Sequence, residues 1–206
     1  LVIYILAFYF SYLLLPETSK SIWIKITLWH IYATLFIYIG SLLLKNSSLY
    51  DPFWSVAPIP IVIYLAITSE NSLMIKLIIL IPIIFWGLRL TINWIISWPG
   101  LKHEDFRYVD LKNTNSLKGE LNNLFGIHLF PTLMVNIALY PLLFVFTNDI
   151  SITLSLCIAS LFTFLSVVLE TVADEQMRKF RNNPDNQGKT MKLKLWKYSR
   201  LSLIHI

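Results

Sequence analysis

Residues 73–98 read LMIKLIILIPIIFWGLRLTINWIISW, and this stretch decides the fold class. Lys76 and Arg89 are its only charged residues. A helix needs about 20 mostly apolar residues to cross the hydrocarbon core of a membrane, and this stretch is longer than that. It therefore predicts a membrane-spanning helix that carries one arginine inside the apolar layer.

Five further apolar segments extend this interpretation to the whole chain. Hydrophobic residues make up 56% of the sequence and charged residues only 14%, whereas soluble domains carry about 25% charged residues. We therefore expect an all-α, polytopic membrane helical bundle of about six spans, with residues 1–200 forming a single membrane-embedded domain. The third span is short and contains Pro58 and Pro60, so we expect it to be kinked or partly re-entrant. The five segments lie at roughly residues 1–15, 22–44, 53–68, 124–146 and 150–177.

Lys and Arg residues are distributed unevenly between the two sides of the predicted bundle. Of the 17 in the sequence, thirteen follow even-numbered spans, three lie on the other side, and Arg89 lies inside a span. Cytoplasmic loops of membrane proteins are enriched in these residues. We therefore expect an integral membrane protein whose even-side loops are cytoplasmic, and we expect a soluble cofactor to enter from that side.

One face of the predicted helix at 73–98 is polar. Trp86, Arg89, Asn93 and Ser97 follow one another at steps of three or four, a spacing that places them on one helical face. An arginine keeps its charge in proteins, so Arg89 needs an anion or a water-filled cleft. The alternative is that Arg89 snorkels to the nearby cytoplasmic interface and has only a structural role.

A second polar stripe ends the last predicted span, in the sequence VVLETVADEQMRKFR. Glu170, Asp174, Arg178 and Arg181 step by four, four and three, and at about 100° per residue they lie within roughly 80° of one another. The stripe places two acids deep in an apolar helix and two arginines nearer the cytoplasm, which is typical of a functional site. The alternative is a salt-bridged helix end with positive flanking residues.

The loop that follows, RNNPDNQGKTMKLKLWKYSR, is basic and ends with two aromatic residues. Its charges suit either anionic lipid or a phosphate-bearing cofactor, and Trp196 or Tyr198 would anchor at the interface or stack on a flat ring.

The sequence has no Gly-rich phosphate loop, nucleophile elbow or P-loop. Its single cysteine, Cys157, excludes an internal disulfide. His30 and His128 lack the spacing of metal ligands, and we expect both to be satisfied structural residues.

Several short motifs occur in a fixed order. They are DPFWS from Asp51, WGLRL from Trp86, EDFRY from Glu104 to Tyr108, E-x-x-x-D-x-x-x-R-x-x-R from Glu170 to Arg181, GK at residues 188–189, and LWKYSR from Leu195 to Arg200. Together they resemble the bacterial branch of the steroid 5-alpha-reductase family over about residues 40–200. The D-x-x-x-R-x-x-R part is shared with the better-known steroid reductases of this family.

The resemblance implies an all-helical reductase in the bacterial inner membrane. Such proteins bind NADPH in a cytoplasmic-side cavity and pass hydride to an activated carbon–carbon double bond of a lipid-like enone. The implied partners are a lipid-like small molecule and membrane lipids, and no nucleic acid. Reduction needs an acid that polarises the carbonyl; Tyr108 and Glu104 are the candidates, and a salt-bridged loop anchor is the alternative for their motif. The implied cofactor-binding residues are Arg89, Asn93, Glu170 (an Asn in the animal enzymes), Asp174, Arg178, Arg181, Lys189, Tyr198 and Arg200.

The last six residues, LSLIHI, do not continue the motif. In the family, His-Pro-x-Tyr-x-Gly-Glu and one more membrane helix follow Tyr-Ser-Arg, whereas Leu201 stands here. LSLIHI is the translation of CTGTCTCTTATACACATC, a transposon end used in sequencing adapters. We therefore expect residues 201–206 to be an adapter artefact. We also expect this chain to lack at least one C-terminal helix of the family, and with it catalytic competence.

Two other functions are compatible with these residues. A membrane methyltransferase similar to the isoprenylcysteine carboxyl methyltransferases would share the helical layout, but its cofactor, S-adenosylmethionine, has no phosphates for the arginines and Lys189 to bind. A non-enzymatic membrane protein would use the stripe only to orient the helix and would tolerate Asp174→Asn. The NADPH-dependent reductase is preferred because phosphates require several cations.

Overall fold

The structure is a computed structural model, and it describes residues 2–16, 21–112 and 117–198. All regular secondary structure in this part of the chain is helical, and no strand occurs in it. This confirms the predicted all-α class. The chain forms two compact units, Leu1–Ser151 and Ile152–Ile206; the first contains most of the helices and the second contains the last long one.

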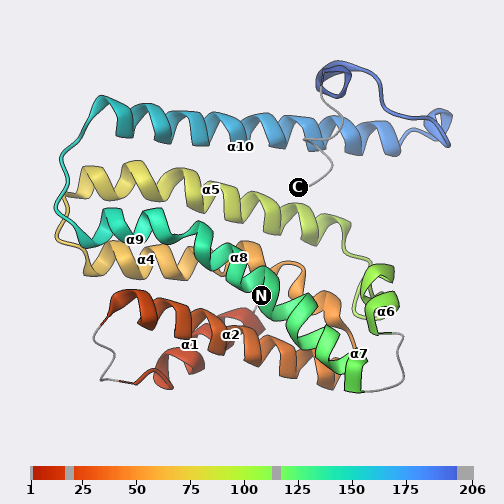
Figure 1. Ribbon diagram of the computed structural model, residues 1–206. Helices are drawn as coiled ribbons and strands as arrows, with labels where there is room; N and C mark the ends of the chain where they lie inside the picture. The colour runs from red at the N-terminus through yellow and green to blue at the C-terminus, as the bar shows by residue number, and fades with distance from the viewer. Residues whose placement is uncertain (1, 17–20, 113–116, 199–206) are drawn as a thin grey trace. The chain divides into compact units, whose positions relative to one another are not determined.

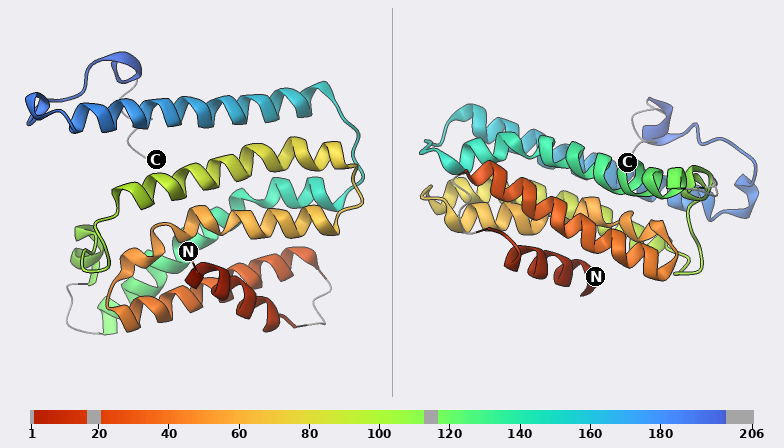
Figure 2. Two further views of the ribbon diagram at one scale, coloured as in Figure 1. Left: turned by 180° about the vertical axis from the view of Figure 1, so that it is seen from behind. Right: turned by 60° about the horizontal axis from the view of Figure 1, so that its bottom comes forward.

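The first unit is a bundle in which long helices alternate with short connecting ones (Figure 1). Its longest helices are α2 (Ile22–Leu44) and α5 (Leu73–Ser97), and α1 (Val2–Leu13) packs against α2 (Figure 2). α2 ends at Lys45, whose φ of 52° is left-handed and whose N–H bonds to carbonyls of the last turn. α5 begins after Ser72, whose hydroxyl accepts a backbone N–H three residues on, as helix N-caps do. The remaining elements are η1 (Ser47–Tyr50), α3 (Phe53–Val56), α4 (Pro58–Thr68), α6 (Phe106–Lys112), α7 (Leu117–Leu121), the π-helical segment η2 (Asn122–Leu129), α8 (Phe130–Ala138) and α9 (Tyr140–Thr147).

Four helical segments of the described chain are long and apolar enough to cross a membrane: Ile22–Leu44, Ser47–Thr68, Leu73–Ser97 and Leu154–Arg181. The predicted membrane helical character is therefore confirmed. α1 is apolar but has only 12 residues, and at 1.5 Å per residue its length of about 18 Å is less than the ~30 Å hydrocarbon core. The first predicted span is thus a helix of less than span length.

The third predicted span, 53–68, is longer than expected because the apolar helical segment begins at Ser47. Its leading short helices, η1 and α3, run into α4, and Pro58 lies in the first turn of α4. Proline is tolerated there because the first N–H groups of a helix have no intrahelical partner. Pro58 therefore marks the start of α4 inside one segment of span length.

The fifth predicted span, 124–146, is not one straight helix. It begins at Leu117 and is bent by 41° between α8 and α9. Pro141 lies in the first turn of α9 and has no N–H to continue the hydrogen bonds of α8, which is a common cause of a sharp bend. The segment also contains η2, whose π-helical form is rare and often occurs at functional sites. The apolar pattern alone predicts neither feature.

A chain of hydroxyl groups runs through the core of the first unit. Thr132 Oγ1 lies 2.9 Å from the Tyr50 hydroxyl and 2.9 Å from Thr34 Oγ1. Thr34 Oγ1 in turn donates to the His30 carbonyl at 2.8 Å. Each hydroxyl has one hydrogen, so Thr34 accepts from Thr132, and Thr132 accepts from Tyr50. The chain joins α8 to α2 and fixes the end of η1, directly before Asp51.

The second unit is built on one long helix, α10 (Leu154–Arg181), of 28 residues. It begins after Thr153, whose hydroxyl accepts the N–H of Leu156 at 3.2 Å. It corresponds to the sixth predicted span, 150–177, and has the expected apolar first part and charged last part. Both of its ends lie four residues later in the chain than predicted. Two short helices follow it, η3 (Pro184–Asn186) and η4 (Lys194–Lys197).

Residues 182–198, which we call the return segment, fold back along the end of α10. The reversal includes Gly188, whose φ of 73° is readily adopted only by glycine. The indole N–H of Trp196 then donates to the Ala173 carbonyl at 2.9 Å. Because Ala173 lies two turns inside α10, the return segment and the last turns of the helix lie side by side.

Candidate functional site

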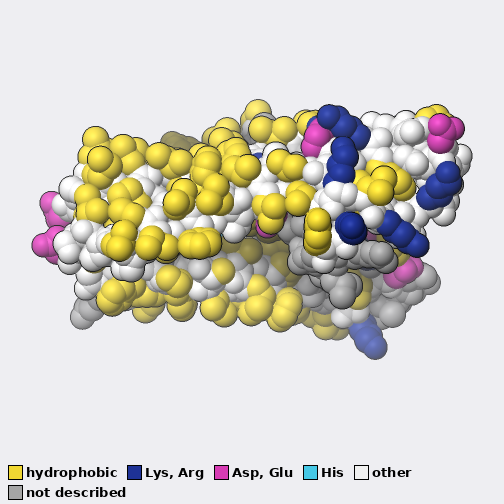
Figure 3. All heavy atoms as spheres, turned by 90° about the horizontal axis from the view of Figure 1, so that it is seen from above, with side chains coloured by type: hydrophobic (Ala, Val, Ile, Leu, Met, Phe, Trp, Pro, Cys, Tyr) yellow, Lys and Arg dark blue, Asp and Glu magenta, His cyan; other side chains and the backbone are white. Residues whose placement is uncertain are grey.

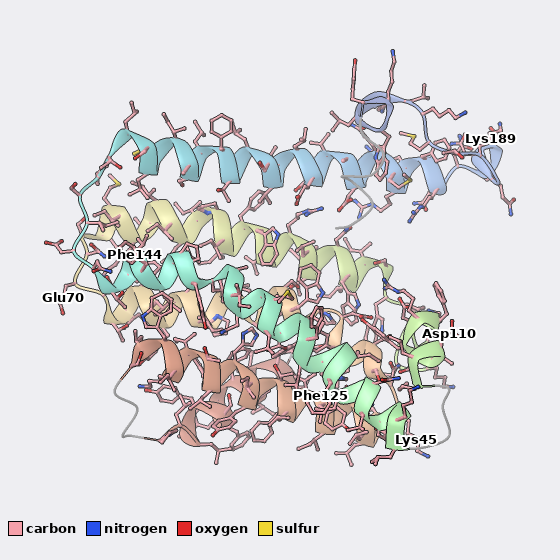
Figure 4. The ribbon with its side chains drawn as sticks, viewed as in Figure 1. Lys45, Glu70, Asp110, Phe125, Phe144 and Lys189 are labelled. Atoms are coloured by element: carbon pink, nitrogen blue, oxygen red, sulfur yellow. The ribbon has the colours of Figure 1, made fainter. Side chains whose placement is uncertain are left out.

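The predicted site residues fall into groups that belong to different elements. Glu104 and Tyr108 belong to what we call the α6 end of the first unit, the end that carries α6 and, in Figure 4, the labelled Lys45 and Asp110. Glu70 marks the opposite end in the same view. Two predicted cofactor residues lie on α5 in the same unit, and the other described ones belong to α10 and the segment that follows it.

Hydrogen bonds join residues 46–51 to residues 101–108, and we call these two stretches the polar corner. The Asn46 side-chain amide donates to two carbonyls of the second stretch, at 2.7 and 2.9 Å. The Asp105 N–H donates to Ser48 Oγ at 2.9 Å. The loop that carries the EDFRY motif is therefore attached to the turn after α2 by both backbone and side-chain groups.

Glu104 is engaged on two sides within the polar corner. Its Oε1 accepts the Ser47 N–H at 2.6 Å and lies 2.5 Å from Lys112 Nζ. These bonds fit the loop-anchor interpretation of the EDFRY motif. A catalytic role for Glu104 stays a prediction.

Tyr108 donates its phenolic hydrogen to Asp51, with 2.5 Å between the two oxygens. Burial, followed by the neighbouring charge of Asp51, raises the pKa of Tyr108 above its ordinary value. The phenol therefore keeps its proton at neutral pH. Its single hydrogen is donated to Asp51, so the role predicted for Tyr108 requires a substrate carbonyl to replace Asp51 as the acceptor. The sequence does not single out Asp51 as a site residue, although Asp51 is the first residue of the DPFWS motif.

Asp105 and Arg107 form a two-pronged ion pair in the same loop. Arg107 Nη2 and Nε donate to the two carboxylate oxygens at 2.7 and 2.9 Å. These bonds lower the pKa of Asp105 below its ordinary value. Because the Arg107 side chain is 66% exposed, the pair contributes at most about 1 kcal/mol to stability.

Arg89 and Asn93 lie on one face of α5, as their spacing predicts. Arg89 is only 7% exposed, and both residues have interaction partners. The ring of Trp86, one turn earlier, meets the ring of Trp54 edge to face at 5.9 Å. A buried guanidinium does not fit the alternative in which Arg89 snorkels into water, since a buried cation needs an anion or polar groups around it.

The stripe predicted from Glu170 to Arg181 lies on one face of α10, because α10 is a continuous helix over these residues. Its members are half-buried except for Arg181, which is exposed. Arg178 donates to the carboxylate of Glu175, and Lys179 Nζ lies 3.4 Å from the same carboxylate. These pairs are those of a salt-bridged helix end, but they use Glu175 and not the two acids of the stripe.

The return segment is anchored beside the stripe. Trp196 is 5% exposed, and the neighbouring backbone N–H of Leu195 donates to the Gln176 side chain at 3.1 Å. Ala173, the acceptor of the indole N–H, precedes Asp174 and so lies about 100° around the helix from it. The anchor therefore lies on the face of α10 next to the stripe.

Cations gather at the end of α10. In Figure 3 the Lys and Arg side chains lie at one end of the visible face, whereas hydrophobic side chains cover much of the rest. Lys189 lies at the tip of the return segment (Figure 4). Tyr198 is 83% exposed, so its ring is available for stacking. Arg200 lies outside the described residues.

The two histidines that are predicted to be structural differ in their surroundings. His128 is bonded through both ring nitrogens, to Ser41 Oγ at 3.1 Å and to the Asn123 carbonyl at 2.9 Å, as expected. His30 is fully buried, but neither of its ring nitrogens has a hydrogen-bond partner among the described residues. Its ring lies against that of Phe53, with 6.0 Å between centroids, and the Asn136 side chain also interacts with it. The expectation of a satisfied histidine stays a prediction for this residue.

Comparison with known proteins gives one family. The family described as "Protein of unknown function (DUF1295)" matches residues 37–201. That range includes the polar corner, the polar face of α5 and the stripe of α10. No curated protein matches the chain, and no solved structure matches it.

Proposed function

Because the chain belongs to the DUF1295 family, which is associated with steroid 5-alpha-reductase-like proteins, we propose that it is a membrane reductase of the bacterial branch of those proteins. Its substrate is a lipid-like or steroid-like enone in the bacterial inner membrane, and its cofactor side is cytoplasmic. NADPH, when bound, would supply the hydride for one carbon of the double bond, and a proton held by the protein would complete the reduction at the other. The observation that carries the proposal is the stripe of α10, with two carboxylates and two guanidinium groups on one face of an apolar helix.

The cations of the second unit suit a cofactor with phosphate groups. Guanidinium groups bind phosphate oxygens in pairs and keep their charge. Arg178 and Arg181 stand at the end of α10, and Lys189 stands on the return segment beyond it. The exposed ring of Tyr198 supplies a surface on which a flat base can stack. S-adenosylmethionine has no phosphates for these cations to bind, which favours the reductase over the methyltransferase.

Within the first unit, the polar face of α5 carries groups that suit a cofactor with phosphate and amide groups. The Arg89 guanidinium adds a buried positive charge, and the Asn93 amide can both donate and accept hydrogen bonds. Glu170 and Asp174 would accept hydrogen bonds from hydroxyl or amide groups of the cofactor.

Tyr108 is the proposed proton-holding group. Its phenol stays protonated at neutral pH, and Asp51 fixes the direction in which it points. To polarise the enone carbonyl, the phenol would turn its single hydrogen from Asp51 to the carbonyl oxygen, and this hydrogen bond would favour hydride addition at the conjugated carbon. Glu104 supports this group by holding the loop between α5 and α6.

A titration of cofactors against one preparation of the full chain in lipid nanodiscs tests the proposal. Tryptophan fluorescence would be followed as NADPH, NADH or S-adenosylmethionine is added. We expect saturable binding of NADPH, binding of NADH that is about tenfold weaker or more because it lacks one phosphate, and no binding of S-adenosylmethionine. Binding of S-adenosylmethionine alone would favour the methyltransferase, and binding of none of the three would favour the non-enzymatic alternative.

A further inference from the structure

A cavity of about 390 Å³ lies at the α6 end of the first unit, between α1, the end of α2, η1 and the last turns of α5. Its volume falls within the range of about 300–1,000 Å³ that is typical of small-molecule sites. Most of its wall is apolar and includes Ile3, Leu44, Leu49 and Pro52. The cavity therefore suits a hydrocarbon chain or another apolar body.

Two indole rings form one side of this cavity. Trp94 and Trp98 are stacked, with 4.8 Å between ring centroids and 23° between planes. They lie at the point where α5 ends and the chain enters the loop before α6. Tryptophan is enriched where membrane helices meet the headgroup layer, so the cavity lies at the depth where an acyl chain joins its headgroup.

Two lysines stand next in the chain to polar-corner residues that line the cavity. Asn46 and Leu101 both line it, and the Asn46 amide donates to the Leu101 carbonyl at 2.7 Å. Their chain neighbours Lys45 and Lys102 are exposed, and neither has an ion-pair partner among the described residues. The acidic residues of the adjoining loop form ion pairs with other residues: Glu104 pairs with Lys112, and Asp105 pairs with Arg107.

We propose that this cavity holds one acyl chain of an anionic phospholipid, whose phosphate lies near Lys45 and Lys102. The apolar wall suits the acyl chain, and the stacked indoles place the bound lipid at the depth of the headgroup layer. The two lysines explain the preference for a negatively charged headgroup. The site goes beyond the proposed reductase function and does not depend on it.

The lipid site is separate from the polar face of α5. Trp94 follows Asn93 directly and therefore lies about 100° around the helix from it, and Ile95 lies about 200° from it. Thr91 lies about 200° from Arg89 by the same rule. The cavity residues of α5 thus face away from the residues proposed to hold the cofactor, and a lipid bound here would be a structural or regulatory ligand and not the reacting substrate.

Quenching of tryptophan fluorescence by brominated lipid tests the site. The full chain would be placed in nanodiscs of zwitterionic phosphatidylcholine that contain a small, increasing fraction of phosphatidylglycerol with brominated acyl chains. A specific site predicts a quenching component that saturates at low mole fraction. The double variant Trp94→Phe, Trp98→Phe should lack that component, since only these indoles line the cavity.

Charge variants distinguish the site from general attraction to the surface. We expect the double variant Lys45→Ala, Lys102→Ala to need about tenfold more brominated phosphatidylglycerol for half-saturation. Lys118→Ala, which removes an exposed charge from α7 in the same unit, should behave like the unaltered chain. Helix content from circular dichroism would verify that each variant is folded.

The proposal is overturned by quenching that rises in proportion to mole fraction without saturating, because lipid that merely surrounds the protein behaves in this way. It is equally overturned if brominated phosphatidylcholine in an unbrominated phosphatidylglycerol host gives the same saturation curve. If the Lys45/Lys102 and Lys118 variants changed the half-saturating mole fraction equally, the assigned position of the phosphate would be excluded.

Discussion

Tyr108 and Asp51 are 57 residues apart in the chain, and their side chains form one hydrogen bond that joins α6 to the turn after η1. Both ends of this bond are fixed by other groups. On one side Glu104 and Asp105 attach the loop before α6 to Ser47 and Ser48. On the other side the hydroxyl chain through Thr132 holds the end of η1. The proposed proton-holding group, Tyr108 of α6, is therefore held in place through residues of α8, α2, η1 and the loop before α6.

Removal of the phenolic hydroxyl should destabilise the polar corner. Tyr108→Phe keeps the ring but leaves the Asp51 carboxylate without this donor, and we expect a loss of about 1–3 kcal/mol in the free energy of unfolding. Asp51→Asn keeps an acceptor oxygen for the phenol and should lower the free energy of unfolding by less than Tyr108→Phe does. Unfolding by sodium dodecyl sulfate, followed by circular dichroism, measures both. A larger loss for Asp51→Asn than for Tyr108→Phe would contradict the assigned direction of the bond.

The ion pair between Asp105 and Arg107 should have a small and pH-dependent effect. The folded pKa of Asp105 is lowered, so its stabilising contribution is present above the ordinary pKa of about 3.9 and is lost as the pH falls through the lowered value. Arg107→Ala should remove this dependence and cost no more than about 1 kcal/mol at neutral pH. Unfolding measured between about pH 1.5 and pH 7, a range that includes the expected loss, compares the two proteins. A loss several times larger would mean that Arg107 has a further role.

Removal of the central hydroxyl of the chain in the core, that of Thr132, should lower the free energy of unfolding. Thr132→Val keeps the shape of the side chain but leaves the Tyr50 hydroxyl without an acceptor and Thr34 without a donor, at a cost of about 1–3 kcal/mol. Thr147→Val is the matched control because the Thr147 hydroxyl donates only to carbonyls of its own helix, and it should change stability by less than about 0.5 kcal/mol. Equal losses in the two variants would argue against the chain as a stabilising unit.

The return segment should be released when its anchor is shortened. Trp196→Phe removes the donor to the Ala173 carbonyl and part of the buried ring, so trypsin should cut faster after Lys189, Lys192 and Lys194. Tyr198→Phe changes an exposed ring and should leave the rate of cleavage unchanged. Mass spectrometry of timed digests identifies the cut sites. No difference between the two variants would show that Trp196 does not hold the segment.

The long apolar helices could be predicted closely from the sequence. The predicted ranges 22–44 and 73–98 correspond to α2 (Ile22–Leu44) and α5 (Leu73–Ser97), because an uninterrupted apolar run of this length has few other stable forms in a membrane. The stripe of α10 could be predicted equally well, since the face of a helix on which residues lie follows directly from their spacing. The bend before Pro141 had a visible signal, but a proline inside a long apolar run is compatible with both a bent and a continuous span.

Features that depend on contacts distant in sequence could not be predicted. The partner of Tyr108 lies 57 residues earlier, and no spacing rule relates the two positions. The π-helical turn at Asn122–Leu129 likewise has no local composition that distinguishes it from an α-helix. Glu175 was overlooked because it lies one position from the stripe, although an acid three residues before an arginine is a familiar helical ion pair.

The affinity for NADPH of two variants at the end of α10 tests the central claim most directly. Arg181 belongs to the stripe, whereas Lys179 carries the same charge two residues earlier, about 200° around the helix, and pairs with Glu175. The account predicts that Arg181→Ala raises the dissociation constant of NADPH about tenfold or more, and that Lys179→Ala leaves it within about twofold. Unchanged affinity in Arg181→Ala, or an equal loss in both variants, would contradict the assignment of the stripe as a cofactor site.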